Sequence, residues 1–135
     1  MIEDEMQEKG FAYLAKQKQY KIVKQEIPFL SRCIDVVLIN KKNELITIEF
    51  KVSKWRHAIE QAYNHRLGAD KSYICLPKRR VTNILRQALE EKGIGLFLYD
   101  ENNKKIISEI IPPPQIPGNV PIFKKILLEK IGEIN

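Results

Sequence analysis

The carboxylates of Asp35 and Glu49 and the amino group of Lys51 lie within residues 33–52, which read CIDVVLINKKNELITIEFKV. Carboxylates bind hard cations and transfer protons, and a lysine stabilises negative charge that develops during a reaction. Apolar residues alternate with other residues on both sides of a polar segment, which predicts two half-buried strands joined by a turn. Because successive side chains on a strand point to opposite faces, Glu49 and Lys51 share one face of the second strand.

The turn between the two strands predicts how they pair. Residues 41–43 (Lys-Lys-Asn) suit a three-residue hairpin loop whose last residue, an asparagine, tolerates the left-handed conformation. Such a loop pairs Asn40 with Glu44, and counting outward places Asp35 directly opposite Glu49. A slip of one residue would put the two acids on opposite faces of the sheet.

Two directly opposed carboxylates repel each other. Opposed residues have Cβ atoms about 4.5–5.5 Å apart, and like charges at that spacing are destabilising. A hard divalent ion such as Mg²⁺, which takes oxygen ligands, would relieve the repulsion between Asp35 and Glu49. The alternative is a cross-strand salt-bridge cluster with Lys51 on a solvated face, an arrangement worth only about 0–1 kcal/mol.

Asp35, followed by Glu49-Phe50-Lys51 at the end of the next strand, resembles the D…(D/E)-x-K signature of the PD-(D/E)XK nuclease superfamily. Ile34 stands where the superfamily usually has proline. The resemblance implies that Asp35, Glu49 and the main-chain carbonyl of Phe50 hold Mg²⁺ or Mn²⁺. It also implies that Lys51 orients or deprotonates the attacking water and stabilises the developing negative charge.

Two helical residues extend the resemblance. In archaeal Holliday-junction resolvases a glutamate on the first helix completes the metal site, and Glu8 matches it best, the alternative being a solvated helix acid. Gln61 resembles the glutamine that follows the ExK strand in RecB-type nucleases, where it would position water or a phosphate. The tyrosine expected four residues later is His65, and we expect His57 and His65 on a basic, polar side of their helix.

Composition indicates a basic protein without a membrane span. The 135 residues carry a formal net charge of +6 with a pI near 9.3, which is compatible with a polyanionic partner. Apolar runs are too short to span a bilayer, and the acidic residues after Met1 are unlike a signal peptide, so we expect a cytoplasmic location. Cys33 and Cys75 have no metal-ligand spacing and are expected to be reduced and buried.

Periodicity predicts an α/β fold in which a mixed central sheet is flanked by helices. Helices are expected at 2–18, 54–66, 81–92 and 122–131, and strands at 20–27, 33–39, 45–52, 71–76, 94–99 and 105–111. The order implies a three-stranded antiparallel meander followed by two parallel crossovers. It matches the restriction-endonuclease-like αβββαβ core, with a C-terminal helix added.

The expected domain organisation is simple. Residues 1–111 form one nuclease-like domain, residues 112–121 a proline-rich connector, and residues 122–135 a C-terminal helix packed on the core or on a partner subunit. The residues expected to contact DNA phosphates are basic and follow the ExK strand and the next strand. They are Lys54, Arg56, Arg66, Lys78, Arg79 and Arg80.

These features predict a Mg²⁺- or Mn²⁺-dependent DNA endonuclease or exonuclease. A dimer is the simplest arrangement for a single-domain nuclease that cuts two strands. One alternative is a catalytically inactive DNA-binding module of the same fold that acts in a larger complex. Another is a small interaction protein that uses its C-terminal helix and connector, and such a protein would show neither metal stabilisation nor salt-sensitive DNA binding.

Overall fold

A computed structural model describes residues 2–114 and 118–133 of the chain. The predicted connector therefore lies partly outside the described residues, as do the last two residues of the predicted C-terminal segment. The helices are α1 (Glu3–Ala15), α2 (Trp55–His65), α3 (Asn83–Lys92) and α4 (Pro121–Lys130). The strands are β1 (Tyr20–Phe29), β2 (Arg32–Asn40), β3 (Leu45–Phe50), β4 (Lys71–Pro77), β5 (Gly95–Tyr99) and β6 (Ile107–Ile111).

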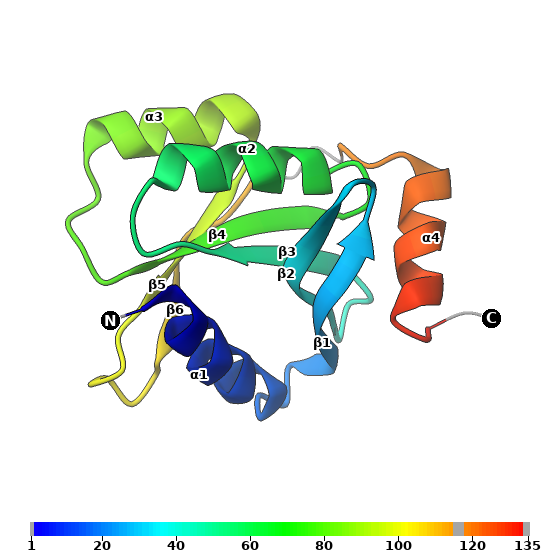
Figure 1. The fold of residues 1–135 in the computed structure, drawn as a ribbon, viewed down its shortest axis with the longest axis horizontal. Helices are drawn as coiled ribbons and strands as arrows, with labels where there is room; N and C mark the ends of the chain where they lie inside the picture. The colour runs from blue at the N-terminus through cyan, green and yellow to red at the C-terminus, as the bar shows by residue number, and fades with distance from the viewer. Residues whose placement is uncertain (1, 115–117, 134–135) are drawn as a thin grey trace.

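The six strands form one mixed sheet in the order in which they occur along the chain. The pairs β1–β2 and β2–β3 are antiparallel, β3–β4 and β4–β5 are parallel, and β6 adds an antiparallel edge. Helix α1 lies on one face of the sheet, and α2 and α3 lie on the other (Figure 1). The predicted α/β fold, with its meander, two crossovers and C-terminal helix, is confirmed.

The register of the β2–β3 hairpin is the predicted one. Val36 pairs with Ile48 and Val37 with Thr47, so the same register carried outward sets Asp35 across from Glu49. The loop ends at Asn43, whose φ of 63° is the left-handed conformation that the three-residue loop requires. Both acids consequently lie on the same face of the meander.

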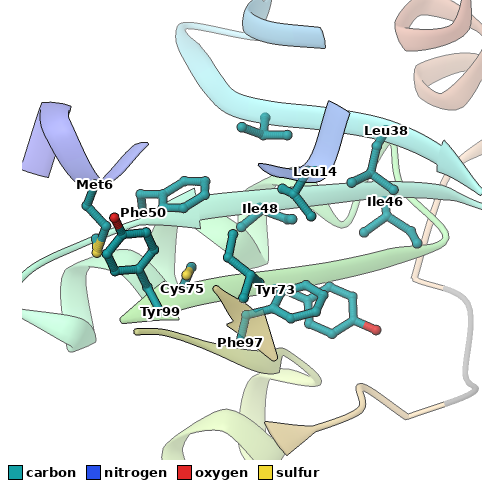
Figure 2. Packing of buried hydrophobic residues seen from close by; sticks show 12 residues of the cluster. Met6, Leu14, Leu38, Ile46, Ile48, Phe50, Tyr73, Cys75, Phe97 and Tyr99 are labelled. Carbon is teal, nitrogen blue, oxygen red and sulfur yellow. The ribbon is translucent and has the colours of Figure 1, made fainter. Parts of the chain in front are cut away.

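The apolar core lies on both faces of the sheet. The cluster on the α1 face combines Met6 and Leu14 with alternate side chains of the central strands, and Figure 2 shows them packed in a continuous layer. On the other face one cluster lies beneath α2 and α3 and another beneath α4. Side chains along a strand point alternately toward α1 and toward the opposite layer. Because chain neighbours of both Asp35 and Glu49 belong to the α1 cluster, these two acids point away from α1.

Helix α4 is anchored by apolar and charged contacts. Leu127 and Ile131 are buried against the β1–β2 end of the sheet. Asp70, just before β4, accepts hydrogen bonds from Lys124 of α4 at 3.1 Å and from Asn119 at 2.7 Å. The same carboxylate accepts the N–H of Leu45 at 2.8 Å, so one residue connects α4 to the start of β3.

Two local expectations were wrong. Strand β1 continues through Pro28 to Phe29 instead of ending before the proline, because it is an edge strand, where a missing N–H is tolerated. Cys33 is exposed, whereas Cys75 is buried as expected. Cys33 pairs with Pro28 of β1 but lies beyond the end of β3, so no third strand covers it.

Within the described residues, none of the helices is long and apolar enough to cross a bilayer.

Candidate active site

Asp35 and Glu49 are locked together by their main chains. One carboxylate oxygen of Glu49, Oε1, accepts the N–H of Asp35 at 3.1 Å. In return, Oδ2 of Asp35 accepts the N–H of Phe50 at 2.8 Å. These reciprocal hydrogen bonds fix both side chains at the point where β3 ends, and Glu49 is only 3% exposed.

Burial and mutual repulsion change the acidity of both carboxyls. Burial raises the pKa of Asp35 to about 6. Burial and then the Asp35 charge raise the pKa of Glu49 to about 9. The hydrogen bond between the two carboxyls lowers the pKa of Asp35 and raises that of Glu49. In the metal-free protein, burial and the mutual repulsion of the two charges therefore favour protonation within the pair.

Further acids approach the pair from β1 and α1. Glu26 lies on β1 between residues that pair with Val36 and Ile34, next to Asp35, and has a left-handed φ of 54°. The charges of Glu26 and Glu3 both raise the pKa of Asp35. Gln7 of α1 contacts Glu26, because its side-chain amide donates to the Glu26 carboxylate at 2.7 Å. Glu26 and Glu3 thus add negative charge around Asp35.

Lys51 is the cation whose charge acts on Glu49. Its main-chain N–H donates to the carbonyl of Cys75 at 3.0 Å, which holds the residue beside β4 although β3 has ended at Phe50. Its Nζ lies 3.9 Å from Oε2 of Glu3, and its charge lowers the pKa of Glu49. The lysine side chain is 20% exposed, so its amino group is accessible from solvent at this end of β3.

His65 of α2 completes the buried side of the site. It is 2% exposed, and Nδ1 lies 3.4 Å from Oε1 of Glu49. Burial, with the charge of Arg32, lowers the pKa of the imidazole to about 4, so this contact joins a neutral ring to a carboxyl and is not an ion pair. Neither ring nitrogen has a hydrogen-bond partner among the described residues.

The expectation that His65 lies on a polar helix side was therefore wrong. The sequence contained the signal, because Ala58, Ala62 and His65 follow the helical spacing of one buried stripe. Gln61, one turn earlier, is half-buried and forms no side-chain hydrogen bond within the described part of the chain. Its predicted role in positioning water or phosphate stays a prediction.

Helix α1 reaches the site with residues other than Glu8. Glu3 accepts the N–H of Val52 at 3.0 Å, and the Gln7 amide lies 3.5 Å from the carbonyl oxygen of Asp35. Glu8 is exposed and forms no hydrogen bond or ion pair among the described residues. Because Glu3 and Gln7 are one turn apart on the helix, they define the face toward the site, and Glu8 lies beside that face.

Most of the predicted phosphate contacts are exposed at the same edge of the sheet. Parallel strands β3 and β4 end there, so Lys54 and residues 78–80 follow neighbouring strand ends, and all are exposed. Arg56 is exposed and stacks on Trp55, with its guanidinium carbon 4.5 Å from the ring centroid.

Arg66 differs from the other predicted phosphate contacts. Its guanidinium donates to the carbonyl of Lys92 at 2.7 Å and packs where a side chain on Gly93 or Gly118 would lie. It closes the carboxyl end of α3, where a cation complements the helix dipole. Arg66 is thus engaged within the fold through one guanidinium nitrogen, and its contact with a phosphate stays a prediction.

The donor set at the pair suits a hard divalent ion. Two carboxylates and the neighbouring Phe50 carbonyl are oxygen ligands of the kind that Mg²⁺ takes, and the raised pKa of each carboxyl reflects burial that disfavours its negative charge. Across residues 2–114 and 118–133, no three His, Cys, Asp or Glu side chains are grouped to hold a metal. A bound Mg²⁺ would therefore keep several waters, as it usually does in protein sites.

Three solved structures share this fold. A protein of unknown function from Silicibacter pomeroyi matches with a TM-score of 0.63 and 17% identity over 90% of this chain and 80% of that chain. A repair endonuclease from Pyrococcus abyssi matches with a TM-score of 0.54 and 18% identity over 84% of this chain. A complex of EndoMS with double-stranded DNA matches with a TM-score of 0.54 and 18% identity over 83% of this chain.

The chain spans 48% of the repair endonuclease chain and 45% of the EndoMS chain. No family model matches the sequence, and no curated protein matches it either. At these identities the similarity shows a common fold. The chemistry therefore has to be argued from the residues of this chain.

Proposed function

We propose that this protein is a divalent-metal-dependent nuclease that hydrolyses phosphodiester bonds in DNA at the Asp35–Glu49 pair. The observation that carries the proposal is the pair itself, a buried Glu49 carboxyl and a half-buried Asp35 carboxyl held together with raised pKa values beside Lys51. A fold that only needed stability would gain nothing from placing two repelling acids together, one buried and one half-buried. The fold shared with a repair endonuclease and with a DNA-bound EndoMS supports the same direction.

Each site residue has a role that follows from its position. Asp35, Glu49 and the carbonyl of Phe50 would hold Mg²⁺ or Mn²⁺, which acidifies water and neutralises charge on the scissile phosphate. The ammonium of Lys51 orients the attacking water and donates to the phosphate oxygen on which charge develops. Both carboxyls keep their position because main-chain N–H groups hold one oxygen of each.

His65 would act as a positioning residue. Its ring contacts Glu49 from the buried side and excludes water from that side. Exposed cations on the loops after β3 and β4 would bind the DNA backbone on both sides of the cleaved bond. Lys54 and residues 78–80 are the cations in the best position for this contact.

The decisive experiment compares wild type with Asp35→Asn in melting curves with Mg²⁺ and with a chelator. With chelator, the substitution removes a repulsion, so the variant should be as stable as wild type or more stable by about 0.2–1 kcal/mol. With Mg²⁺ at ten times its dissociation constant, wild type should gain about 1.4 kcal/mol. For a domain of this size that is a rise in melting temperature of about 3–5 °C.

The variant should lose most of that metal-induced rise and all cleavage of linear, branched and single-stranded DNA. Glu44→Gln, at the opposite end of β3, is the matched control and should keep both the metal-induced rise in melting temperature and the cleavage of DNA. Equal rises for wild type and Asp35→Asn would contradict the metal site. A protein that binds DNA in a salt-sensitive manner but gains no stability from Mg²⁺ or Mn²⁺ would instead be the inactive DNA-binding module.

A further inference from the structure

A cavity of about 410 Å³ lies at the other end of the sheet from the Asp35–Glu49 pair. Its lining includes four aromatic side chains, which are Tyr13, Tyr20, Tyr73 and Phe97. The rings of Tyr73 and Phe97 stack on each other with centroids 4.2 Å apart, and Figure 2 shows them at the end of the core away from Met6. The volume falls within the range of small-molecule sites, about 300–1,000 Å³. We call this site the aromatic cavity.

Cations surround the aromatic cavity. Lys41 and Lys42 reach it from the β2–β3 loop and Lys105 from the segment before β6. All three are exposed, and none takes part in an ion pair among the described residues. Lys71 also lines the cavity, but Glu44 neutralises it at 3.2 Å. The cavity therefore combines aromatic walls with three uncommitted positive charges, which favours an aromatic anion.

Two acids line the cavity, and Glu44 already accepts hydrogen bonds from Asn40 and Lys71, whereas Glu109 is exposed. The hydroxyl of Tyr73 donates to the carboxylate of Glu109. Burial and this contact raise the pKa of the tyrosine well above its usual range, so the hydroxyl stays protonated. A carboxylate only accepts hydrogen bonds, so the remaining acceptor positions of Glu109 are available to an N–H donor.

The aromatic cavity is separate from the proposed active site. Ile46, Tyr73 and Phe97 belong to the core cluster on the α1 face, whereas Glu49 points to the opposite face. Ile46 also lies three residues before Glu49 on β3, which corresponds to about 10 Å along a strand. A ligand in the cavity would therefore not touch Asp35 or Glu49.

We propose that the aromatic cavity binds a nucleotide unit whose base carries an amino group, as in cytosine. The base stacks on the aromatic walls, an interaction that every base can make because each has a π-face. The phosphate contacts Lys41, Lys42 and Lys105, and the amino group of the base donates to Glu109. A free nucleotide and a nucleotide within single-stranded DNA share this chemistry. The proposal does not depend on the proposed nuclease activity.

The experiment is a calorimetric titration of the full chain in the presence of a chelator, which prevents cleavage. The probes are CMP, UMP, cytidine, inorganic phosphate and a single-stranded oligocytidylate DNA. CMP should bind more tightly than cytidine and than phosphate, because only CMP uses both the walls and the lysines. Tighter binding of the oligonucleotide would identify single-stranded DNA as the source, and binding of CMP alone would identify a free nucleotide. No binding of either, or equal binding of CMP and phosphate, would overturn the proposal.

Matched variants place the binding in the cavity. Lys42→Ala combined with Lys105→Ala should weaken CMP about tenfold, corresponding to about 1.4 kcal/mol. Lys104→Ala, an exposed neighbour outside the lining, should leave the affinity unchanged. Equal affinities of wild type and the Lys42/Lys105 double variant would show that CMP binds elsewhere and would overturn the proposal.

Glu109→Gln tests how the base is recognised. Wild type should prefer CMP to UMP, and the variant should lose most of that preference while its melting temperature stays close to that of wild type, since the residue is exposed. Tyr20→Leu, which keeps an apolar side chain but removes the ring, should weaken CMP and UMP alike. Equal binding of CMP and UMP by wild type would contradict the role of Glu109.

Discussion

Glu44 directly precedes β3 and Glu49 lies near the other end of that strand, yet the fold treats their charges in opposite ways. Glu44 accepts the side-chain amide of Asn40 at 2.8 Å and pairs with Lys71 at 3.2 Å. The Asn40 hydrogen bond, opposed by burial and helped by Lys71, lowers the pKa of Glu44. Glu49 is buried beside Asp35, and burial raises its pKa to about 9.

The difference shows which charge the chain stabilises by itself. At the Glu44 end, a donor and a cation from the same chain satisfy the carboxylate. At the Glu49 end, burial removes water and the nearest groups include another acid and the neutral ring of His65. A buried charge without a partner is costly. Glu49 and Asp35 are therefore suited to a cation from outside the chain, whereas Glu44 is not.

The largest expected effect is on DNA cleavage, and it distinguishes Lys51, at the Glu49 end of β3, from Lys71, at the Glu44 end. Lys51→Ala should reduce DNA cleavage by about 10²–10⁴-fold, the range for losing a group that moves protons or stabilises charge. Its metal-induced melting shift should remain, because a charged lysine has no lone pair for a metal. Lys71→Ala, at the Glu44 end, should leave cleavage near wild type. Full activity of Lys51→Ala would remove the nuclease assignment.

A smaller effect concerns DNA binding at the Glu49 end. Replacing residues 78–80 by alanine should weaken binding and lower the slope of log affinity against log salt by about 0.9 for each lost phosphate contact. A control variant that removes three charges elsewhere combines Lys16→Ala, Lys18→Ala and Lys125→Ala, all at exposed positions. If both triple variants changed the slope equally, net charge and not this edge would govern binding.

The hairpin register and the Asp35–Glu49 pair could be predicted from the sequence. The alternation of apolar residues indicates which face of the sheet each side chain takes. The left-handed conformation of Asn43 fixes the loop length and therefore which residues pair across the turn, so local rules determine a contact between two strands. The order of strands and helices was predictable for the same reason, since each element carries its own periodicity. These features depend on neighbours in the chain.

Contacts between elements distant in the chain were not predictable. Arg66 turns toward α3, an interaction that local spacing on α2 does not reveal. Glu26 approaches Asp35 through a left-handed residue in the middle of a strand, which no turn signal marks. The choice of Glu3 and Gln7 over Glu8 depends on how α1 is rotated against the sheet, a difference of about 100° per residue.

The last prediction uses pH to compare the two glutamates in the metal-free protein. An unfolded carboxyl titrates near pH 4, and the folded pKa of Glu49 is raised to about 9. Between these values the folded protein holds more protons than the unfolded chain, so the free energy of unfolding falls as pH rises. Glu49→Gln removes this dependence. The free energy of unfolding of this variant should therefore exceed that of wild type by about 1–3 kcal/mol between about pH 5 and 9. Urea unfolding with chelator measures the difference.

Glu44→Gln should show the opposite sign over a different pH range. Because the folded pKa of Glu44 is lowered, its contribution is present above the unfolded pKa and is lost as pH falls through the folded pKa. The variant should be less stable than wild type by about 0–1 kcal/mol above about pH 5, and the difference should vanish in acid. If Glu49→Gln instead followed this same course, Glu49 would be an ordinary paired carboxylate. The contrast between the two ends of β3, on which the metal site depends, would then be lost.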